Sequence, residues 1–454
     1  MPRHPRPCSC PAARPPSPGG HRRRLADRFP GVGGRGGRGR SCLGARRLCP
    51  SPPGRRRGPA DLGPDRRRAG VGMSLSPVDA FREAPRVRAL AQTLARRVQP
   101  GRTYRLMEFC GGHTHAIAHH GLPDLLPPAI ELIHGPGCPV CVLPVARLEQ
   151  ALHAARLPGV ILATYADLMR VPGVRGLTLM RARAEGADVR MVASPLDVLS
   201  LARAHPERVV IFMAIGFETT APATALMLQA ARTQGLANLR VLCNHVLTPA
   251  ALGAILADDG GARPDGILGP AHVATVIGAQ AFRPFAEDAP AGRGVPITIA
   301  GFEPVDMLLA IDRLIERLNA GEVAVDNACP RVVAEAGNPK AREALAQVFC
   351  RRETFDWRGF GAVPHSALRL APDWAAFDAE ACFDLPDPVA PDPPGCACAD
   401  IVRGRRRPGQ CPLFGRLCTP DTPQGACMVS TEGACAAHWT HGRFRDLPAF
   451  GAPA

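Results

Sequence analysis

The chain has 454 residues, 46% of them apolar, which is enough to bury more than one hydrophobic core, so we expect roughly two to four domains. It contains no run of about eighteen apolar residues, which argues against a transmembrane helix and a membrane partner. The formal charge of +15 is local: residues 1–72 hold 18 arginines and three acidic residues, and the neutral remainder gives no indication of nucleic-acid binding.

Residues 1–72 are rich in Arg, Gly and Pro, without the apolar core of a secretory signal or the amphipathic period of a transit peptide. Such a segment buries too little apolar area to offset its ordering entropy, so we expect a disordered basic leader. At Met73 the composition changes to that of a helix entry. We interpret Met73 as the functional start and the leader as an upstream extension of the reading frame; the alternative is a nucleic-acid-binding arm.

From Arg102 to about residue 320, short apolar runs alternate with helical stretches rich in Ala and Leu. This alternation predicts an α/β fold with largely parallel sheets. We expect one α/β domain at 73–200, a second at 201–330 and a smaller terminal domain at 331–454. The predicted strands are 104–109, 129–135, 159–165, 189–194, 208–216, 239–244, 265–269 and 295–301.

Polar side chains gather where these strands end. Each one is more often a cap or a turn residue than a ligand, but ligands of open α/β sheets bind outside the carboxyl ends of the strands. So many at one kind of position predict a shared cleft. They are Cys110, His113, His115, Cys138, Cys141, Glu218, Thr219, Thr220, Asn244, His245, His272, Glu303 and Asp306.

Six cysteines lie within the 40 residues from 396 to 435. Without an export signal we expect the reducing cytoplasm, which disfavours a framework of disulfides alone. Only one close pair, Cys396 and Cys398, is present, whereas zinc usually takes two close pairs. The spacing therefore favours a 4Fe-4S cluster, which would take four of the six thiols: Cys396, Cys398, Cys411, Cys418, Cys427 and Cys435.

A second set of thiols comprises Cys110, in CGGHTH, with Cys138 and Cys141, in GPGCPVC. The CxxC spacing alone leaves structural zinc, a redox disulfide and iron open. Thiolate and imidazole both suit iron, and thiols at two loops of one α/β face could hold a ferrous ion with open positions. The isolated cysteines, by contrast, are expected to pack as small apolar side chains: Cys243, Cys329, Cys350 and Cys382.

The chain has no Walker A run, no G-x-G-x-x-G after a predicted strand and no HExxH. ATP, NAD and zinc-protease chemistry are therefore not indicated. Any activated group would have to come from a partner.

Five motifs closely resemble the HypD family of hydrogenase formation proteins, and the resemblance covers about residues 80–440 in order. The cysteine motifs among them are long and specific. They are CGGHTHAI (110–117), HGPGCPVCVLP (134–144), GFETTAP (216–222), NHVLTP (244–249) and CPLFGRLCTPDTPQGACMVSTEGACAA (411–437).

The resemblance implies a cytoplasmic maturation factor for NiFe-hydrogenase. Members of this family act with the small chaperone HypC as a scaffold on which iron receives two cyanides and one carbon monoxide, giving Fe(CN)2CO. The cyanides come from the partner HypE. The implied fold has two α/β domains and a third, cysteine-rich domain with a 4Fe-4S cluster.

The resemblance also implies roles for single residues. Cys110, Cys138 and Cys141 match the iron-associated cysteines, and His113 matches the histidine beside the first of them. The cluster ligands are Cys396, Cys411, Cys418 and Cys435, with Cys398 and Cys427 as an adjacent redox pair; an exchange of Cys396 and Cys398 is the alternative.

Release of cyanide from a thiocyanate-like group takes two electrons. The hypothesis that follows is a relay from the cluster through Cys398 and Cys427 to the Cys138/Cys141 pair by thiol–disulfide exchange. Whether the chain is itself an enzyme stays open. The alternative function is a free-standing iron–sulfur thiol-disulfide oxidoreductase.

Overall fold

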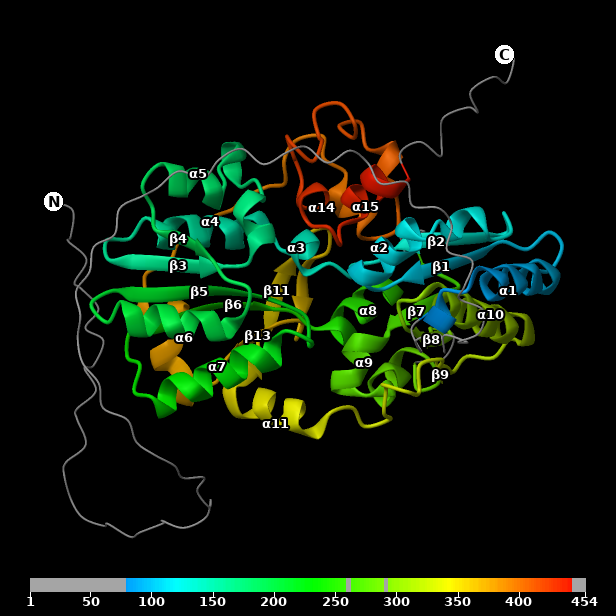
Figure 1. The fold of residues 1–454 in the computed structure, drawn as a ribbon, viewed down its shortest axis with the longest axis horizontal. Helices are drawn as coiled ribbons and strands as arrows, with labels where there is room; N and C mark the ends of the chain where they lie inside the picture. Colours follow the sequence, from blue (N-terminus) through cyan, green and yellow to red (C-terminus); the bar gives the residue numbers. More distant parts are fainter. Residues whose placement is uncertain (1–78, 259–262, 290–292, 443–454) are drawn as a thin grey trace, which may run out of the picture. The chain divides into compact units, whose positions relative to one another are not determined.

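The computed structural model describes residues 79–258, 263–289 and 293–442 (Figure 1). The expectations of a disordered leader at 1–72 and a start at Met73 lie outside these ranges. Among the described residues, no helix is both long enough and apolar enough to cross a membrane.

One parallel sheet has five strands in the order β2-β1-β7-β8-β9. In this sheet β1 pairs with β2 from Tyr104 opposite Ile130 to Glu108 opposite His134. Because β1 and β2 are parallel and in step, the loops that follow them leave the same edge of the sheet. The strands are β1 (Tyr104–Glu108), β2 (Ile130–His134), β7 (Gly266–Pro270), β8 (Ile297–Ala300) and β9 (Val325–Asn327).

The second parallel sheet has the order β4-β3-β5-β6. β3 and β5 are buried almost throughout, as expected for strands covered on both faces. The strands are β3 (Val160–Thr164), β4 (Val189–Met191), β5 (Val209–Gly216) and β6 (Leu239–His245).

These sheets confirm the parallel α/β class but do not follow the boundary expected at residue 200. That boundary falls between β4 and β5, which belong to one sheet. The five-stranded sheet is instead built from two stretches, 104–134 and 266–327, with the four-stranded sheet inserted between them. Alternation of strands and helices predicts the elements, but strand order depends on packing between segments distant in sequence.

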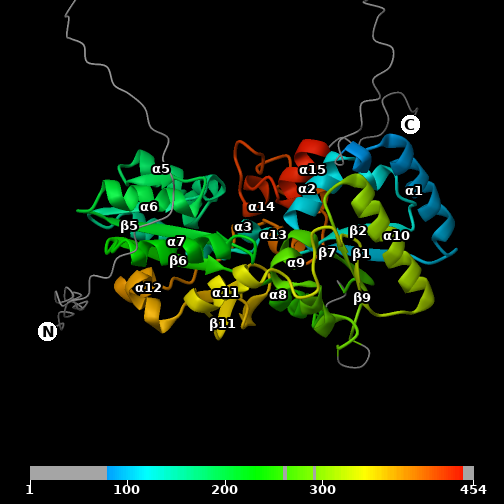
Figure 2. The same ribbon diagram turned by 60° about the horizontal axis from the view of Figure 1, so that its bottom comes forward.

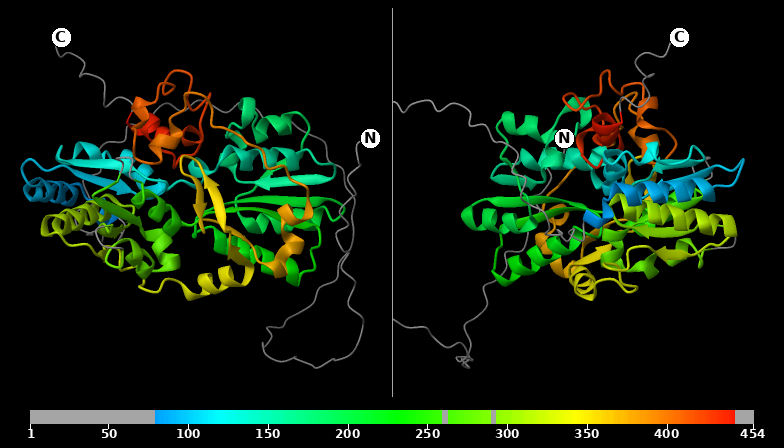
Figure 3. Two further views of the ribbon diagram at one scale, coloured as in Figure 1. Left: turned by 180° about the vertical axis from the view of Figure 1, so that it is seen from behind. Right: turned by 45° about the vertical axis from the view of Figure 1, so that its right-hand side comes forward.

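Helices cover the sheets (Figures 2 and 3). Of the ten α-helices described up to residue 320, six have Pro in the first turn. Ser194 and Asp197 form a capping box at α6. α1 packs against α10, where Arg97 Nε lies 2.6 Å from Asp312. The helices to residue 320 are α1 (Ala84–Arg97), α2 (Gly111–His119), α3 (Pro139–Val142), α4 (Val145–Ala155), α5 (Leu179–Ala184), α6 (Pro195–Ala204), α7 (Ala221–Thr233), α8 (Thr248–Leu256), α9 (Ala271–Ile277) and α10 (Pro304–Ala320).

The part of the chain after residue 331 has two different placements. Residues 339–382 pack on the four-stranded sheet, where the Cys243 thiol lies 3.3 Å from the Leu368 carbonyl oxygen. Residues 396–442 pack instead on α2 and α3 (Figure 2). The elements are α11 (Pro339–Val348), β10 (Phe349–Arg351), β11 (Thr354–Trp357), β12 (Gly361–Pro364), β13 (Leu368–Leu370), α12 (Ala379–Cys382), α13 (Cys398–Ile401), α14 (Ala426–Val429) and α15 (Ala434–His441).

Short 3-10 helices connect several of these elements. They are η1 (Asp79–Phe81), η2 (Leu122–Asp124), η3 (Ala166–Arg170), η4 (Val174–Gly176), η5 (Ala279–Phe285), η6 (Pro372–Phe377) and η7 (Pro408–Gln410).

Candidate functional site

Cys110 lies directly before α2, at the carboxyl end of β1. Its backbone N–H donates to the buried Glu108 carboxylate at 3.1 Å, and its side chain is buried. The Cys110 sulfur lies 3.7 Å from Nδ1 and 3.8 Å from Nε2 of His272. Burial raises the pKa of the Cys110 thiol far above its usual value. A bound cation would favour the thiolate there.

The GPGCPVC loop is packed against this cysteine. The Gly111 N–H donates to the Gly137 carbonyl at 3.1 Å. A methyl group at Gly137 would overlap the backbone of Cys110, so only glycine fits this contact. The two thiol-bearing loops that are separate in the sequence therefore meet at one edge of the sheet.

Cys138 and Cys141 are joined by a disulfide, with their Cα atoms 5.2 Å apart, and both side chains are buried. In this form neither sulfur is a thiolate, so neither can bind iron. The structure thus presents the oxidised state of the redox pair considered from the sequence. Reduction would release two thiols beside Cys110.

His113 is placed differently from the expectation of an imidazole beside Cys110. Its ring is fully buried, and Nε2 donates to the carbonyls of Ala300 and Gly301, each at 3.1 Å. Its backbone N–H, rather than its ring, faces the Cys110 thiol. The neighbouring imidazole is that of His272, whose pKa is lowered to about 4 by burial and by His113, so it is neutral near pH 7.

Two carboxylates adjoin the Cys110 loop, and neither stood out in the sequence. Glu108 is buried and bonds Thr114 and, at 2.8 Å, His134 Nδ1. Glu432 packs over Gly111, where an added methyl would meet its Cβ at 2.5 Å. Burial, and then Asp167, raise the pKa of Glu432. A carboxyl from the cysteine-rich segment thus lies directly on the start of α2.

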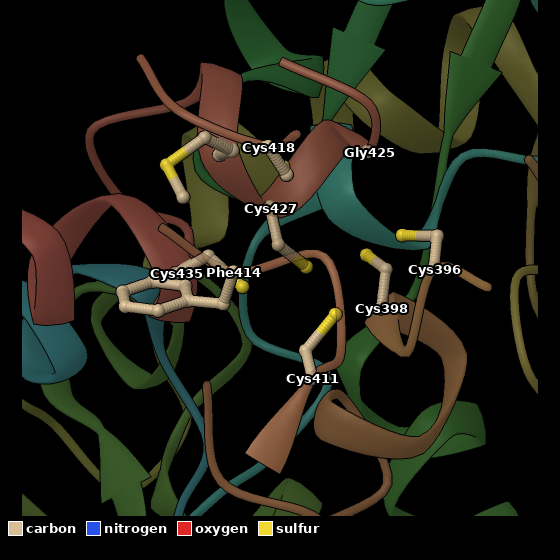
Figure 4. Close-up of a pocket in the computed structure, with 9 residues that line it drawn as sticks. Cys396, Cys398, Cys411, Phe414, Cys418, Gly425, Cys427 and Cys435 are labelled. Atoms are coloured by element: carbon tan, nitrogen blue, oxygen red, sulfur yellow. The ribbon is translucent and has the colours of Figure 1, made fainter. Parts of the chain in front are cut away.

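The six cysteines of 396–435 line one small cavity, which Phe414, Gly425 and Met428 complete (Figure 4). In Figure 4 the sulfurs of Cys396, Cys398, Cys411 and Cys427 point toward one another. The lining contains no carboxylate or imidazole, so sulfur is the only donor atom that these side chains offer. This donor set fits an iron–sulfur cluster, which is held by cysteine thiolates.

Within this cavity, Cys398 and Cys427 have the strongest effect on each other's pKa. The Cys427 thiol lowers the pKa of Cys398 to about 7, and Cys398 raises the pKa of Cys427 well above its usual value. The Cys398 sulfur is also 4.0 Å from the Cys141 carbonyl oxygen. This pair is the part of the cavity that adjoins the disulfide loop.

Arg358 also holds the disulfide loop in place. Its buried guanidinium donates to the carbonyls of Cys141 at 2.9 Å and Leu143 at 2.8 Å, and it pairs with Asp392. Its backbone N–H also donates to the Val142 carbonyl at 2.8 Å. Sequence reasoning missed Arg358, because its only local signal is a short aromatic stretch.

The remaining strand-end residues are dispersed. Glu218 is buried and accepts from the N–H and hydroxyl of Thr248, both at 2.8 Å. His245 bonds Thr224 at 2.9 Å, and Asp306 pairs with Arg331. His115 is exposed on α2. Of the strand-end residues that were expected to share a cleft, the structure therefore brings together Cys110, Cys138, Cys141 and His272. The buried His113 ring lies close to this group.

Known proteins resemble the chain along nearly all of its described length. A family model named HypD, described as "Hydrogenase formation hypA family", matches residues 85–442. The hydrogenase maturation factor HypD of Rhizobium leguminosarum bv. viciae is 51% identical over 374 residues, covering 81% of this chain and 96% of that protein.

Two further relatives carry the same name. Hydrogenase maturation factor HypD of Azotobacter vinelandii is 52% identical over 373 residues, or 81% of this chain and 97% of the relative. Its namesake from Escherichia coli K12 is 44% identical over 370 residues, or 80% and 97%.

Proposed function

Because the chain belongs to the HypD family of hydrogenase formation proteins, we propose that it matures NiFe-hydrogenase by holding iron while the Fe(CN)2CO group is assembled. The observation that carries this proposal is the meeting of three features: the buried Cys110 thiol, the Cys138–Cys141 disulfide and the cysteine-lined cavity. The Cys110 thiol can bind a soft metal, the disulfide can take up or release two electrons, and the cavity offers several thiols. All three lie on adjoining loops.

In this proposal iron is the cargo, and Cys110 is its first ligand. Reduction of the disulfide frees Cys138 and Cys141 as two more thiolates, which are available to iron while reduced and leave it when the disulfide closes again. The neutral ring of His272 is the imidazole nearest to Cys110. The small chaperone HypC is proposed to share the iron, which leaves positions for cyanide and carbon monoxide.

The cyanides are proposed to arrive from HypE as thiocyanate-like groups. Release of each cyanide from sulfur consumes two electrons, and oxidation of one dithiol to a disulfide supplies two. The Cys138–Cys141 pair matches this stoichiometry. The setting proposed for this chemistry is the cytoplasm.

The disulfide must be reduced again after each transfer. The Cys398 thiolate attacks one sulfur of the Cys138–Cys141 bond, and Cys427 then attacks the resulting mixed disulfide. The products are a Cys398–Cys427 disulfide and the Cys138/Cys141 dithiol, so electrons and sulfur bonds balance. The approach of Cys398 to the Cys141 carbonyl supports this route.

A 4Fe-4S cluster bound in the cavity would pass electrons, one at a time, from an external one-electron reductant to restore the Cys398/Cys427 dithiol. We propose Cys396, Cys411, Cys418 and Cys435 as its ligands, because all four line the cavity and the other two thiols shift each other's pKa most strongly. The apolar lining by Phe414 and Met428 limits the access of water.

The test is a pair of variants, Cys398→Ser and Cys427→Ser, each produced in a bacterium that lacks its own homologue. Both variants are expected to retain the iron–sulfur absorption and to lose nearly all hydrogenase maturation. Cys350→Ser is the matched control, because Cys350 lies on β10 outside the cavity. Hydrogenase activity at wild-type level in both variants would contradict the relay.

A second candidate function is a free-standing iron–sulfur thiol-disulfide oxidoreductase, which the disulfide beside Cys398 favours. The two functions differ in what accompanies the purified protein. The scaffold co-purifies with a small chaperone and is inactive on disulfide substrates, whereas the oxidoreductase turns over such substrates alone.

A further inference from the structure

Three histidines converge on the outer side of α2, away from the thiols. His115 and His119 are four residues apart on this helix and therefore share a face. His441, the last residue of α15, meets them from the cysteine-rich segment. One ring nitrogen from each lies within 4.8 Å of the others. The ring centroids of His119 and His441 are 5.0 Å apart, and those of His115 and His441 are 5.3 Å apart.

This cluster is distinct from the iron-associated site on the same helix. The His113 ring is fully buried and donates to the carbonyls of Ala300 and Gly301. His115 and His119 are exposed, so their side chains project from another face of α2. No cysteine belongs to the cluster.

We propose that His115, His119 and His441 bind a divalent first-row transition-metal ion of the zinc or nickel type. Imidazole nitrogen is a preferred donor for these ions, and two histidines at i and i+4 on a helix are a recurrent zinc-binding pair. The cluster contains no carboxylate, which makes it unsuited to calcium or magnesium. Three histidines with water as the fourth ligand complete a tetrahedral site.

The geometry requires only a small adjustment. Nitrogens at about 2.0–2.1 Å from a tetrahedral ion are about 3.4 Å apart, compared with the 4.8 Å limit of the present cluster. Because His115 and His119 are exposed, we expect rotation of their side chains to close this gap.

Occupancy of this site would fasten two functional segments together. α2 starts immediately after Cys110, and α15 carries Cys435 as its second residue. An ion bound between the far ends of these helices therefore stabilises the docking of the cysteine-rich segment on the Cys110 loop. The proposal does not depend on the function of the thiols, because binding is measured directly.

The test uses the full chain, purified anaerobically with its iron and dialysed against Zn²⁺. We expect one zinc per chain with nitrogen and oxygen ligands only, as seen by X-ray absorption at the zinc edge. This zinc should be absent from His441→Ala and His119→Ala. It should be retained in His153→Ala, which removes an exposed histidine at the end of α4.

Two further measurements keep the result interpretable. Iron content and the melting temperature without zinc should be the same in all variants, and zinc should raise the melting temperature only of the wild type and His153→Ala. If His441→Ala misfolds, the milder His115→Gln replaces it in the same comparison. Sulfur-ligated zinc, retention of zinc in the folded histidine variants, or no bound zinc in the wild type would each overturn the proposal.

Discussion

The two thiol regions are held in place by different means. Cys110 and the Cys138–Cys141 loop follow β1 and β2, whose parallel register places Glu108 opposite His134. The cysteine cavity has no comparable framework. Between Cys396 and Cys435 the structure has only α13 and α14, each of four residues, a three-residue 3-10 helix and the start of α15.

The two regions therefore differ in whether they need a bound metal to keep their structure. Helices of four residues have almost no stability of their own, so the cavity segment depends on packing and on whatever its sulfurs bind. The strand-end site depends on hydrogen bonds of the sheet. Loss of a bound metal should therefore disorganise the cavity and leave the strand-end site in place.

The largest effect is expected for Cys411→Ser, which removes one cavity thiol. Four-point attachment of a cluster fails without a ligand, so we expect nearly all cluster iron and its visible absorption to be lost. Iron analysis after anaerobic purification checks this. Cys350→Ser, whose thiol lies near the Leu370 carbonyl, is the control that should keep full iron. Full iron in Cys411→Ser would show that Cys411 is not a ligand.

Gly137→Ala should disrupt only the strand-end site. Its methyl would overlap the backbone of Cys110 and move the two loops apart. We expect cluster absorption to persist while hydrogenase maturation falls by roughly 100-fold, as for other displaced reactive groups. Gly253→Ala is the matched control, because its added methyl group would lie 3.3 Å from the nearest atom, which belongs to the Phe285 ring. Equal loss of absorption in Gly137→Ala would show that the two regions are not separable.

Arg358→Met tests the link between the regions. It removes the donors to the Cys141 and Leu143 carbonyls and leaves Asp392 without its guanidinium. We expect a loss of about 3 kcal/mol in the free energy of unfolding, measured by chemical denaturation. Arg369→Met, at an exposed position of β13, should change it by less than about 0.5 kcal/mol. A similar loss in both variants would remove any special role for Arg358.

A variant of Glu218 tests the stability of the sheets separately from the thiols, because Glu218 contacts neither thiol region. Burial raises its pKa from 4.5 to about 7. The folded state therefore holds this proton more tightly than the unfolded state. The contribution is fully present below pH 4.5 and is lost as pH rises toward 7, and it amounts to about 3 kcal/mol.

Glu218→Gln should abolish this part of the pH dependence. Denaturation of the variant at pH 5 and pH 7 should give a smaller fall in stability than the wild type shows. Iron–sulfur absorption should be unchanged at both values. An unaltered pH slope would mean that another group titrates.

Much of the fold was predictable because strands and thiols have local signals. All eight apolar runs form β1 to β8, and the two thiol sets are adjacent to each other. Strand order was not predictable, since the return of the chain to β7 beside β1 depends on packing over more than a hundred residues. For the same reason His272 replaced His113 as the imidazole beside Cys110.

The contacts between the regions had no sequence signal either. Arg358 comes from a hairpin between β11 and β12 that was not expected, and Glu432 reaches Gly111 from a distant segment. Neither residue is marked by spacing or by neighbours of the same type. Tertiary packing alone gives them their place.

The central claim, that iron is held at Cys110 while its ligands are added, is tested most directly by infrared spectroscopy. The protein is isolated anaerobically with its small chaperone partner, as wild type, Cys110→Ala and Cys350→Ser. We expect cyanide and carbonyl stretching bands in the wild type and in Cys350→Ser, and no bands in Cys110→Ala. Bands of full intensity in Cys110→Ala, or none in a wild type that carries its full iron, would contradict the claim.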